Sequence, residues 1–189
     1  MISLNLQDLH KKLNQHLEDQ SKNWSSFIYA KEKGFYQGFD EIKIDGWRPT
    51  ENRFRTYDID KYLSKEKLAL DIGSNCGFFT LHVSKFVKEI DGVEINPYLI
   101  SISEDTKNFL HVHNANFHNS SFENFKTEKK FDVIFSLAND STIDQNTKFH
   151  FNEYIDKINK LLKKDGIIIF ESQAMDIYLN LNLLQNTIF

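Results

Sequence analysis

The sequence predicts an α/β fold in which helices cover both faces of a mostly parallel sheet. Short apolar runs at 68–72, 89–95, 131–137 and 167–172 alternate with segments of helical periodicity. A turn that contains two glycines joins the first run to a helix. Because parallel strands need a crossover connection, usually a helix, this alternation is typical of a doubly wound sheet.

Composition and charge limit the classes of protein to consider. The chain has 189 residues, 40% of them hydrophobic and 26% charged, which suits one globular domain. A net charge of −4 with interspersed signs argues against nucleic acid as a partner, since that binding depends on phosphate neutralisation. The N-terminus does not resemble a signal peptide, no apolar run approaches ~20 residues, and Cys76 is the single cysteine. We therefore expect a cytoplasmic protein without a membrane segment.

Residues 1–45 are predicted to form an N-terminal helical extension to a domain at 46–189. Apolar residues such as Leu9, Leu13 and Leu17 recur at helical spacing through residues 3–30. Such a helix would pack on the domain or on a second subunit. Alternatively, it would serve as a lid over the functional site.

The strand predicted at 68–72 carries the most informative motif. It contains Asp71, and a turn with Gly73 and Gly77 leads into a helix that is predicted to run to about Val87. The spacing Asp71-x-Gly73-x-x-x-Gly77 is neither the G-x-G-x-x-G of dinucleotide-binding folds nor a Walker loop. An acid at this strand end would repel phosphate, so the turn suits a ligand with an ammonium group and hydroxyls. An ordinary strand-turn-helix is the alternative.

This stretch resembles the first motif of class I S-adenosylmethionine-dependent methyltransferases, which implies a Rossmann-like fold and S-adenosylmethionine as cofactor. In that family the acid and the glycines lie against the methionine part of the cofactor. The resemblance covers about residues 45 to 175. It implies cofactor contacts for Asp71, Gly73, Ser74, Asn75, Cys76, Gly77 and Phe78.

The second predicted strand also ends in an acid. Glu94 lies 23 positions after Asp71, and an acid about 20 residues after such a turn can accept hydrogen bonds from both ribose hydroxyls. Ile95 follows it, and Pro97 begins the next predicted helix. A solvent-facing glutamate is the alternative.

A short third strand is predicted at 113–118. In the resembling family the segment after it contacts the adenine base, commonly through an Asp or Asn side chain and a backbone amide. This sequence has Ser121 at the usual acidic position, so Asn119, Ser121 and Phe122 are the candidates for that contact.

The fourth predicted strand, 131–137, ends at Ser136 and Leu137, which we expect to face the transferable methyl group. The residues after it do not form the Asn-Pro-Pro-Tyr motif of methyltransferases that act on amide or exocyclic nitrogens. If the acceptor is a hydroxyl, a base helps, and Asp140 and His150 are the catalytic candidates, with Tyr36 as a contributor. No compact set of metal ligands is visible, so no metal is expected.

Three arginines precede the first strand within eight positions, and we single out Arg53 as a candidate for the cofactor carboxylate. The alternative is a solvated helix whose arginines extend into water.

The C-terminal part is predicted as a helix at 149–162 that is closed by Lys163, Lys164 and Gly166, followed by an apolar strand at 167–172. The family's sheet normally ends with two further strands, the last antiparallel. Residues 174–184 look helical, so the sequence predicts a sheet that lacks those two strands. An uncovered edge could pair with a second copy of the chain, which would give a homodimer.

Segments 46–53 and 71–79 are similar to methyltransferases encoded with bacterial surface-polysaccharide genes and, more faintly, to enzymes that modify tRNA wobble uridine. The resemblance implies methylation of a small molecule or of a sugar-bearing or phosphate-bearing precursor, on oxygen. The alternatives are a cofactor-binding regulatory partner without turnover, a tRNA-modifying methyltransferase, and an NAD(P)-dependent enzyme, which the glycine spacing disfavours.

Overall fold

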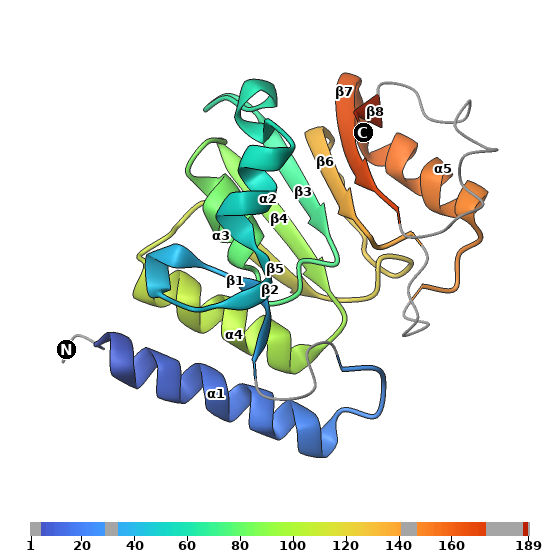
Figure 1. Ribbon diagram of the computed structural model, residues 1–189. Coiled ribbons are helices and arrows are strands. Elements are labelled where there is room, and N and C mark those ends of the chain that lie inside the picture. The colour runs from blue at the N-terminus through green and yellow to red at the C-terminus, as the bar shows by residue number, and fades with distance from the viewer. Residues whose placement is uncertain (1–4, 29–33, 141–146, 173–186, 189) are drawn as a thin grey trace.

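The computed structural model describes residues 5–28, 34–140, 147–172 and 187–188, and its centre is a six-stranded sheet (Figure 1). All neighbouring strands in this sheet are parallel, in the order β5-β4-β3-β6-β7-β8. The first strand of this sheet, β3, therefore lies in its middle, the next two strands extend it to one edge, and the last three extend it to the other. The strands are β3 (Leu68–Ile72), β4 (Glu89–Glu94), β5 (Ala115–Asn119), β6 (Phe131–Leu137), β7 (Leu162–Glu171) and β8 (Thr187–Ile188).

Helices cover both faces of the sheet, as the sequence predicts. Along β3, Ala69 belongs to the hydrophobic core beneath α3 (Phe78–Ser84) and α4 (Pro97–Phe109). The next residue, Leu70, belongs to the core beneath α5 (Phe151–Leu161), because successive side chains of a strand point to opposite faces. The predicted doubly wound α/β fold is confirmed. Among the described residues, no helix is both long enough and apolar enough to cross a membrane.

The N-terminal part packs on this sheet domain. The helix α1 (Leu6–Asn23) lies along α4 (Figure 1), where Lys12 and His16 contact the carboxylate of Asp105 at 2.6 and 2.7 Å. Leu9 and Leu13 are fully buried in the same core as α3 and α4. The described N-terminal residues thus share their core with the sheet, and a domain boundary at residue 45 stays a prediction.

Two short strands, one α-helix and two 3-10 helices lie between α1 and β3 in the described part of the chain. Parallel strands β1 (Phe35–Gly38) and β2 (Gly46–Pro49) form a separate two-stranded sheet. The helix α2 (Thr50–Thr56) follows, and short 3-10 helices span Asp40–Ile42 and Ile59–Tyr62. These elements place β1 beside the glycine turn after β3.

The structure differs from the sequence prediction around α5 and β7. The predicted cap at 163–166 is wrong, because Leu162 already has extended backbone and begins β7. Leu162 pairs with Phe131, and the register then shifts before Val133 pairs with Ile167. The residues expected to close the helix are the extra residues of this bulge.

At the far edge, the two-residue strand β8 pairs in parallel with Ile168 and Ile169 of β7. The sequence analysis did not predict this strand. The helical character expected for 174–184 lies outside the described residues.

The helix α3, which follows the glycine turn after β3, ends at Ser84, three residues before the predicted end.

Replacing Leu13 with alanine should lower the free energy of unfolding by about 2 to 5 kcal/mol, because the buried side chain would leave a cavity. Chemical denaturation followed by circular dichroism measures this change. The control is Lys11→Ala, an exposed position on the same helix, which should change the value by less than about 0.5 kcal/mol. A loss below about 1 kcal/mol for Leu13→Ala would contradict the packing of α1 as part of the cooperative core.

Candidate functional site

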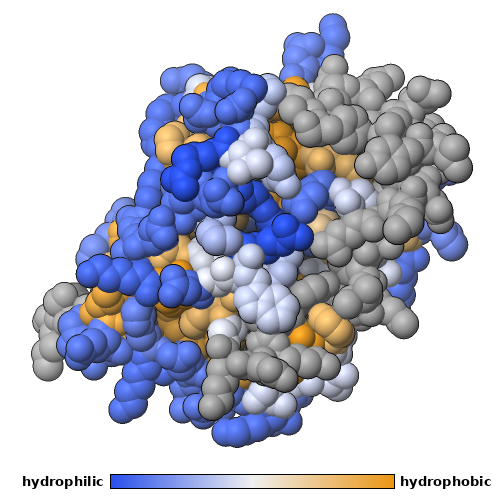
Figure 2. All heavy atoms as spheres, in the orientation of Figure 1, coloured by the Kyte–Doolittle hydropathy of each residue, from blue (hydrophilic) through white to orange (hydrophobic). Residues whose placement is uncertain are grey.

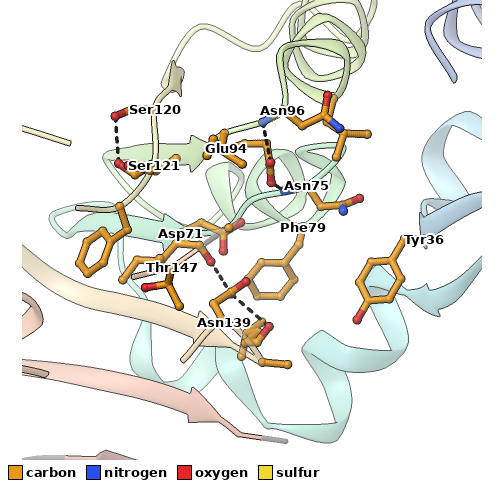
Figure 3. Close-up of a pocket in the computed structure, with 18 of the residues that line it drawn as sticks. Tyr36, Asp71, Asn75, Phe79, Glu94, Asn96, Ser120, Ser121, Asn139 and Thr147 are labelled. Carbon is orange, nitrogen blue, oxygen red and sulfur yellow. Dashed lines mark hydrogen bonds between the residues drawn. The ribbon is translucent and has the colours of Figure 1, made fainter. Parts of the chain in front are cut away.

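One cleft opens where β3, β4, β5 and β6 end. Asp71, Glu94, Ser121 and Leu137, one from each strand end or the turn after it, line this cleft. Figure 3 shows Asp71, Glu94 and Ser121 around it, and Figure 2 shows hydrophilic side chains gathered near the middle of this face. Strand ends on both sides of the point where the strand order reverses form the usual ligand site of an open α/β sheet.

The glycine turn after β3 is closed by the side chain of Asn139, which lies two residues beyond the end of β6. Gly73 has a φ of +67°, and a Cβ at this position would lie 2.1 Å from Oδ1 of Asn139. The Asn139 amide donates to the carbonyl of Ile72 and, at 3.1 Å, to that of Leu137 (Figure 3). The turn therefore requires glycine both for its backbone conformation and for the space that Asn139 occupies.

The same turn is held from the other side by Gln37 of β1. This buried amide donates to the carbonyl of Ser74 at 3.2 Å and accepts from the backbone N–H of Phe78 at 3.1 Å. It satisfies one of the unpaired donors at the N-terminus of α3. The sequence analysis did not assign Gln37, because it lies 41 residues from Phe78 in a segment with no recognised motif.

Asp71 is a buried acid in the cleft wall. Its carboxylate is 3% exposed and accepts a hydrogen bond of 2.6 Å from the hydroxyl of Thr80. Burial raises the pKa of Asp71 to about 7, although the Thr80 hydrogen bond and the positive charge of Arg53 act in the opposite direction. A ligand with a positive charge would favour the ionised form.

Glu94 organises the second strand end. Its carboxylate accepts the backbone N–H of Asn75 at 3.0 Å and that of Asn96 at 2.9 Å (Figure 3). It thereby joins the glycine turn to the start of α4. Each carboxylate oxygen has more than one lone pair, so both can still accept a hydroxyl from a ligand.

Asn119, exposed at the end of β5, donates from its side chain to the carbonyls of Glu94 at 3.1 Å and Ile95 at 2.8 Å. Asn119 thus holds two strand ends together. The turn after β5 places Ser121 and Phe122 in the cleft wall, and the Phe122 ring packs edge-on against Tyr154 with centroids 5.2 Å apart.

Arg53 lies in the cleft wall and pairs with an acid at the end of β7. Its side chain is 10% exposed, and one guanidinium nitrogen lies 3.5 Å from a carboxylate oxygen of Glu171. Arg48 approaches the other oxygen of Glu171 at 3.8 Å. Burial and the contact with Glu171 raise the pKa of Tyr57 beside them. Arg53 is therefore within electrostatic reach of both Asp71 and Glu171.

The predicted catalytic residues lie in different environments. Asp140 is buried one residue beyond the cleft wall and accepts a hydrogen bond of 2.8 Å from Ser172, and burial raises its pKa. His150 is exposed at the start of α5, where its backbone N–H donates to the carboxylate of Glu153 at 2.9 Å. His150 does not line the cleft. Tyr36 does line it and is drawn in Figure 3.

Nine of the predicted cofactor residues line the cleft, namely Arg53, Asp71, Gly73, Asn75, Glu94, Ile95, Ser121, Phe122 and Leu137. The other six do not line it: in the part of the chain that the structure describes, Asn119 is exposed at the end of β5, and five are buried behind the wall, namely Ser74, Cys76, Gly77, Phe78 and Ser136. Burial raises the pKa of the Cys76 thiol, which does not favour a nucleophilic role. The cleft also includes residues that the sequence analysis did not assign to the cofactor, among them Gln20, Trp24, Phe79, Asn96, Asn139 and Tyr154.

The residues of this cleft fit S-adenosylmethionine. A buried carboxylate at Asp71 suits an ammonium group, Glu94 offers oxygens for ribose hydroxyls, and Phe122 offers an apolar ring for a base. Within the described ranges, no group of three or more His, Cys, Asp and Glu side chains could hold a metal ion.

Comparisons with known proteins agree with this fit. A family model described as a methyltransferase domain matches residues 63–186, which is more than half of the chain. A putative protein N5-glutamine methyltransferase of Methanocaldococcus jannaschii is 29% identical over 121 residues, which cover 55% of this chain and 60% of that protein. The chain therefore spans less than two thirds of the length of this curated relative.

Two solved structures illustrate the shared fold. Coclaurine N-methyltransferase, bound to N-methylheliamine and S-adenosylhomocysteine, matches with a TM-score of 0.56 and 14% sequence identity. The match covers 87% of this chain and 50% of the coclaurine N-methyltransferase chain. The tRNA m1G37 methyltransferase of M. jannaschii matches with a TM-score of 0.53 and 17% sequence identity, and the match covers 72% of this chain and 40% of that methyltransferase chain. At these identities the likeness concerns the fold alone.

These relatives carry different acceptors in their names, so the comparisons leave the acceptor class open. They give no support to the finer resemblance to enzymes of polysaccharide gene clusters, which stays a prediction. The match of the family model to most of the sheet and its cleft is sufficient for the family itself. The chain belongs to the methyltransferase-domain family.

Proposed function

We propose that this protein binds S-adenosylmethionine in the cleft and catalyses transfer of its methyl group to an acceptor. The observation that carries the proposal is the convergence of Asp71, Glu94 and Phe122, from the ends of three adjacent parallel strands, on one cleft. In this proposal Asp71 faces the ammonium group of the cofactor and Arg53 its carboxylate. Glu94 accepts from the ribose, and the turn with Ser121 and Phe122 contacts the adenine.

The bound cofactor supplies a methyl group that its sulfonium has already activated for displacement. The protein then has to align the acceptor and exclude water. Phe79 and Leu137 line the cleft with apolar surface between Asp71 and the end of β6, where they would keep water from the reacting atoms. Asn139 holds the ends of β3 and β6 at a fixed separation through its two donated hydrogen bonds.

We infer that the acceptor atom is oxygen. In the relative named as a protein N5-glutamine methyltransferase the acceptor would be an amide nitrogen, but β6 of this chain is followed by Ala138, Asn139 and Asp140 and not by Asn-Pro-Pro-Tyr. The amide of Asn139 already donates to two backbone carbonyls. Asp140, buried beside it, is the candidate base for a hydroxyl proton, because a raised pKa brings a carboxylate closer to the working pH of a base.

The net charge of the chain supports one class of acceptor. A net charge of −4 disfavours a long polyanion, so we propose a small molecule or a sugar-bearing or phosphate-bearing precursor. A cofactor-binding partner without turnover is the alternative function, and an RNA acceptor is the alternative substrate.

Calorimetric titration with S-adenosylhomocysteine tests the binding step, with an expected dissociation constant of micromolar order, or about −8 kcal/mol. Asp71→Ala and Glu94→Ala should each abolish measurable binding. Glu104→Ala, an acid on the outer part of α4 that pairs with Lys107, is the matched control and should bind as the wild type does. A folded wild-type chain that does not bind would contradict the proposal.

Transfer of a labelled methyl group from S-adenosylmethionine to a panel of hydroxyl acceptors, amide peptides and tRNA tests the reaction. We expect label in a small hydroxyl acceptor and none in the peptides or the tRNA. Cofactor binding with no labelled product in any acceptor would favour the regulatory alternative.

The affinity for S-adenosylhomocysteine should depend on pH through Asp71. Its folded pKa of about 7 means that the carboxyl is mostly protonated at pH 6, whereas binding of an ammonium group favours the ionised form. The dissociation constant at pH 6 should therefore be about tenfold larger than at pH 8. Asp71→Asn, which cannot ionise, should bind more weakly and show no such dependence. A wild-type affinity that does not change between pH 6 and 8 would contradict the contact.

A further inference from the structure

One lysine of α5 is bonded to the turn that follows β5. The ammonium group of Lys157 donates to the backbone carbonyls of Phe122, Glu123 at 2.9 Å and Phe125 at 2.8 Å. An ammonium group has three donors, so this one turn uses its full donor capacity. Lys157 itself does not line the cleft among the described residues.

Aromatic rings enclose the same ammonium group. It lies 4.9 Å from the centroid of the Phe122 ring and 6.0 Å from that of Phe149. A cation over the face of a ring is attracted to it by about 0.5 to 2 kcal/mol, depending on its exposure. Lys157 thus contacts Phe122 twice, through its carbonyl and through its ring, and that ring also lines the cleft.

The bonded carbonyls fix the direction of the neighbouring amides. In a trans peptide the C=O and the following N–H point in opposite directions. Because the Phe122 carbonyl points to Lys157, the N–H of Glu123 points away from α5. Lys157 therefore sets the orientation of a peptide in the stretch that lines the cleft through Ser121, Phe122 and Glu123.

A second set of bonds ties this turn to the segment before α5. The carboxylate of Glu123 accepts the hydroxyl of Thr147 at 2.7 Å and the backbone N–H groups of Lys148 and Phe149. Thr147 lines the cleft as well. Lys157 and Glu123 together make the turn and the start of α5 one hydrogen-bonded unit.

We propose that Lys157 is a positioning residue for the adenine end of the cofactor, which it never touches. Its three hydrogen bonds hold the turn at 121–125 in the conformation that recognises the base, so selectivity for adenine depends on a side chain of α5. This inference rests on the proposed function, because it requires that the cofactor's base lies against this turn.

The test compares Lys157→Met with Lys160→Met by calorimetric titration. Methionine keeps much of the apolar stem and removes the ammonium group, and Lys160 is an exposed lysine on the same helix. The two ligands are S-adenosylhomocysteine and its analogue with hypoxanthine in place of adenine. The wild type and Lys160→Met should prefer the adenine ligand by at least tenfold. In Lys157→Met the affinity for the adenine ligand should fall at least tenfold and the preference should shrink to about two- or threefold.

A loss of stability alone would lower both affinities together, so the ratio of the two separates positioning from general destabilisation. Should Lys157→Met fail to fold, Lys157→Arg serves as the second variant. Its planar guanidinium keeps the charge but cannot direct three donors from one atom, so the preference should again fall. An unchanged preference in a folded Lys157 variant, or no preference in the wild type, would overturn the inference while the proposed function stands. A wild type that binds neither ligand would overturn both.

Discussion

The arrangement of the site depends on the parallel pairing of β3 with both β4 and β6. Parallel strands end at the same edge of a sheet, so Asp71, Glu94 and Leu137 meet there although up to 66 residues separate them in sequence, from 71 to 137. Because β4 and β6 leave β3 in opposite directions, the connecting chains diverge above it and leave a crevice. The cleft is thus a consequence of the strand order, and the side chains determine what it can hold.

Those side chains favour a ligand with positive charge and hydroxyls. Two acids, Asp71 and Glu94, are buried in the wall, and Arg53 is the cation beside them. A pyrophosphate next to these carboxylates would meet like charge. An amino acid moiety has both an ammonium group for Asp71 and a carboxylate for Arg53, and a ribose has two hydroxyls for Glu94. The pattern of charge therefore distinguishes this cleft from a dinucleotide site on a similar sheet.

The sequence was sufficient to predict the doubly wound α/β fold and to single out Asp71, Glu94 and Arg53, three charged residues that line the cleft. The spacing of Asp71, the glycines and Glu94 is local to consecutive strands, so it can be recognised along the chain. Gln37 and Lys157 could not be found in this way, because each acts on backbone atoms of an element 30 or more residues away and nothing in their own surroundings marks them. The start of β7 was missed because Lys163 to Gly166 satisfy the usual pattern of a helix end, while pairing with β6 and a bulge determine the actual conformation. His150 was chosen for its residue type, and the helix predicted at 149–162 already placed it near a helix start, but its exposure there was not evident from the sequence.

The most direct test of the account is hydrogen–deuterium exchange of the full chain with and without saturating S-adenosylhomocysteine. If one ligand contacts three strand ends together, amides in 73–78, 94–96 and 120–123 should all exchange more slowly in the complex. Slower exchange in only one of these segments, or protection elsewhere with these three unchanged, would contradict a cofactor site at the carboxyl ends of β3, β4 and β5.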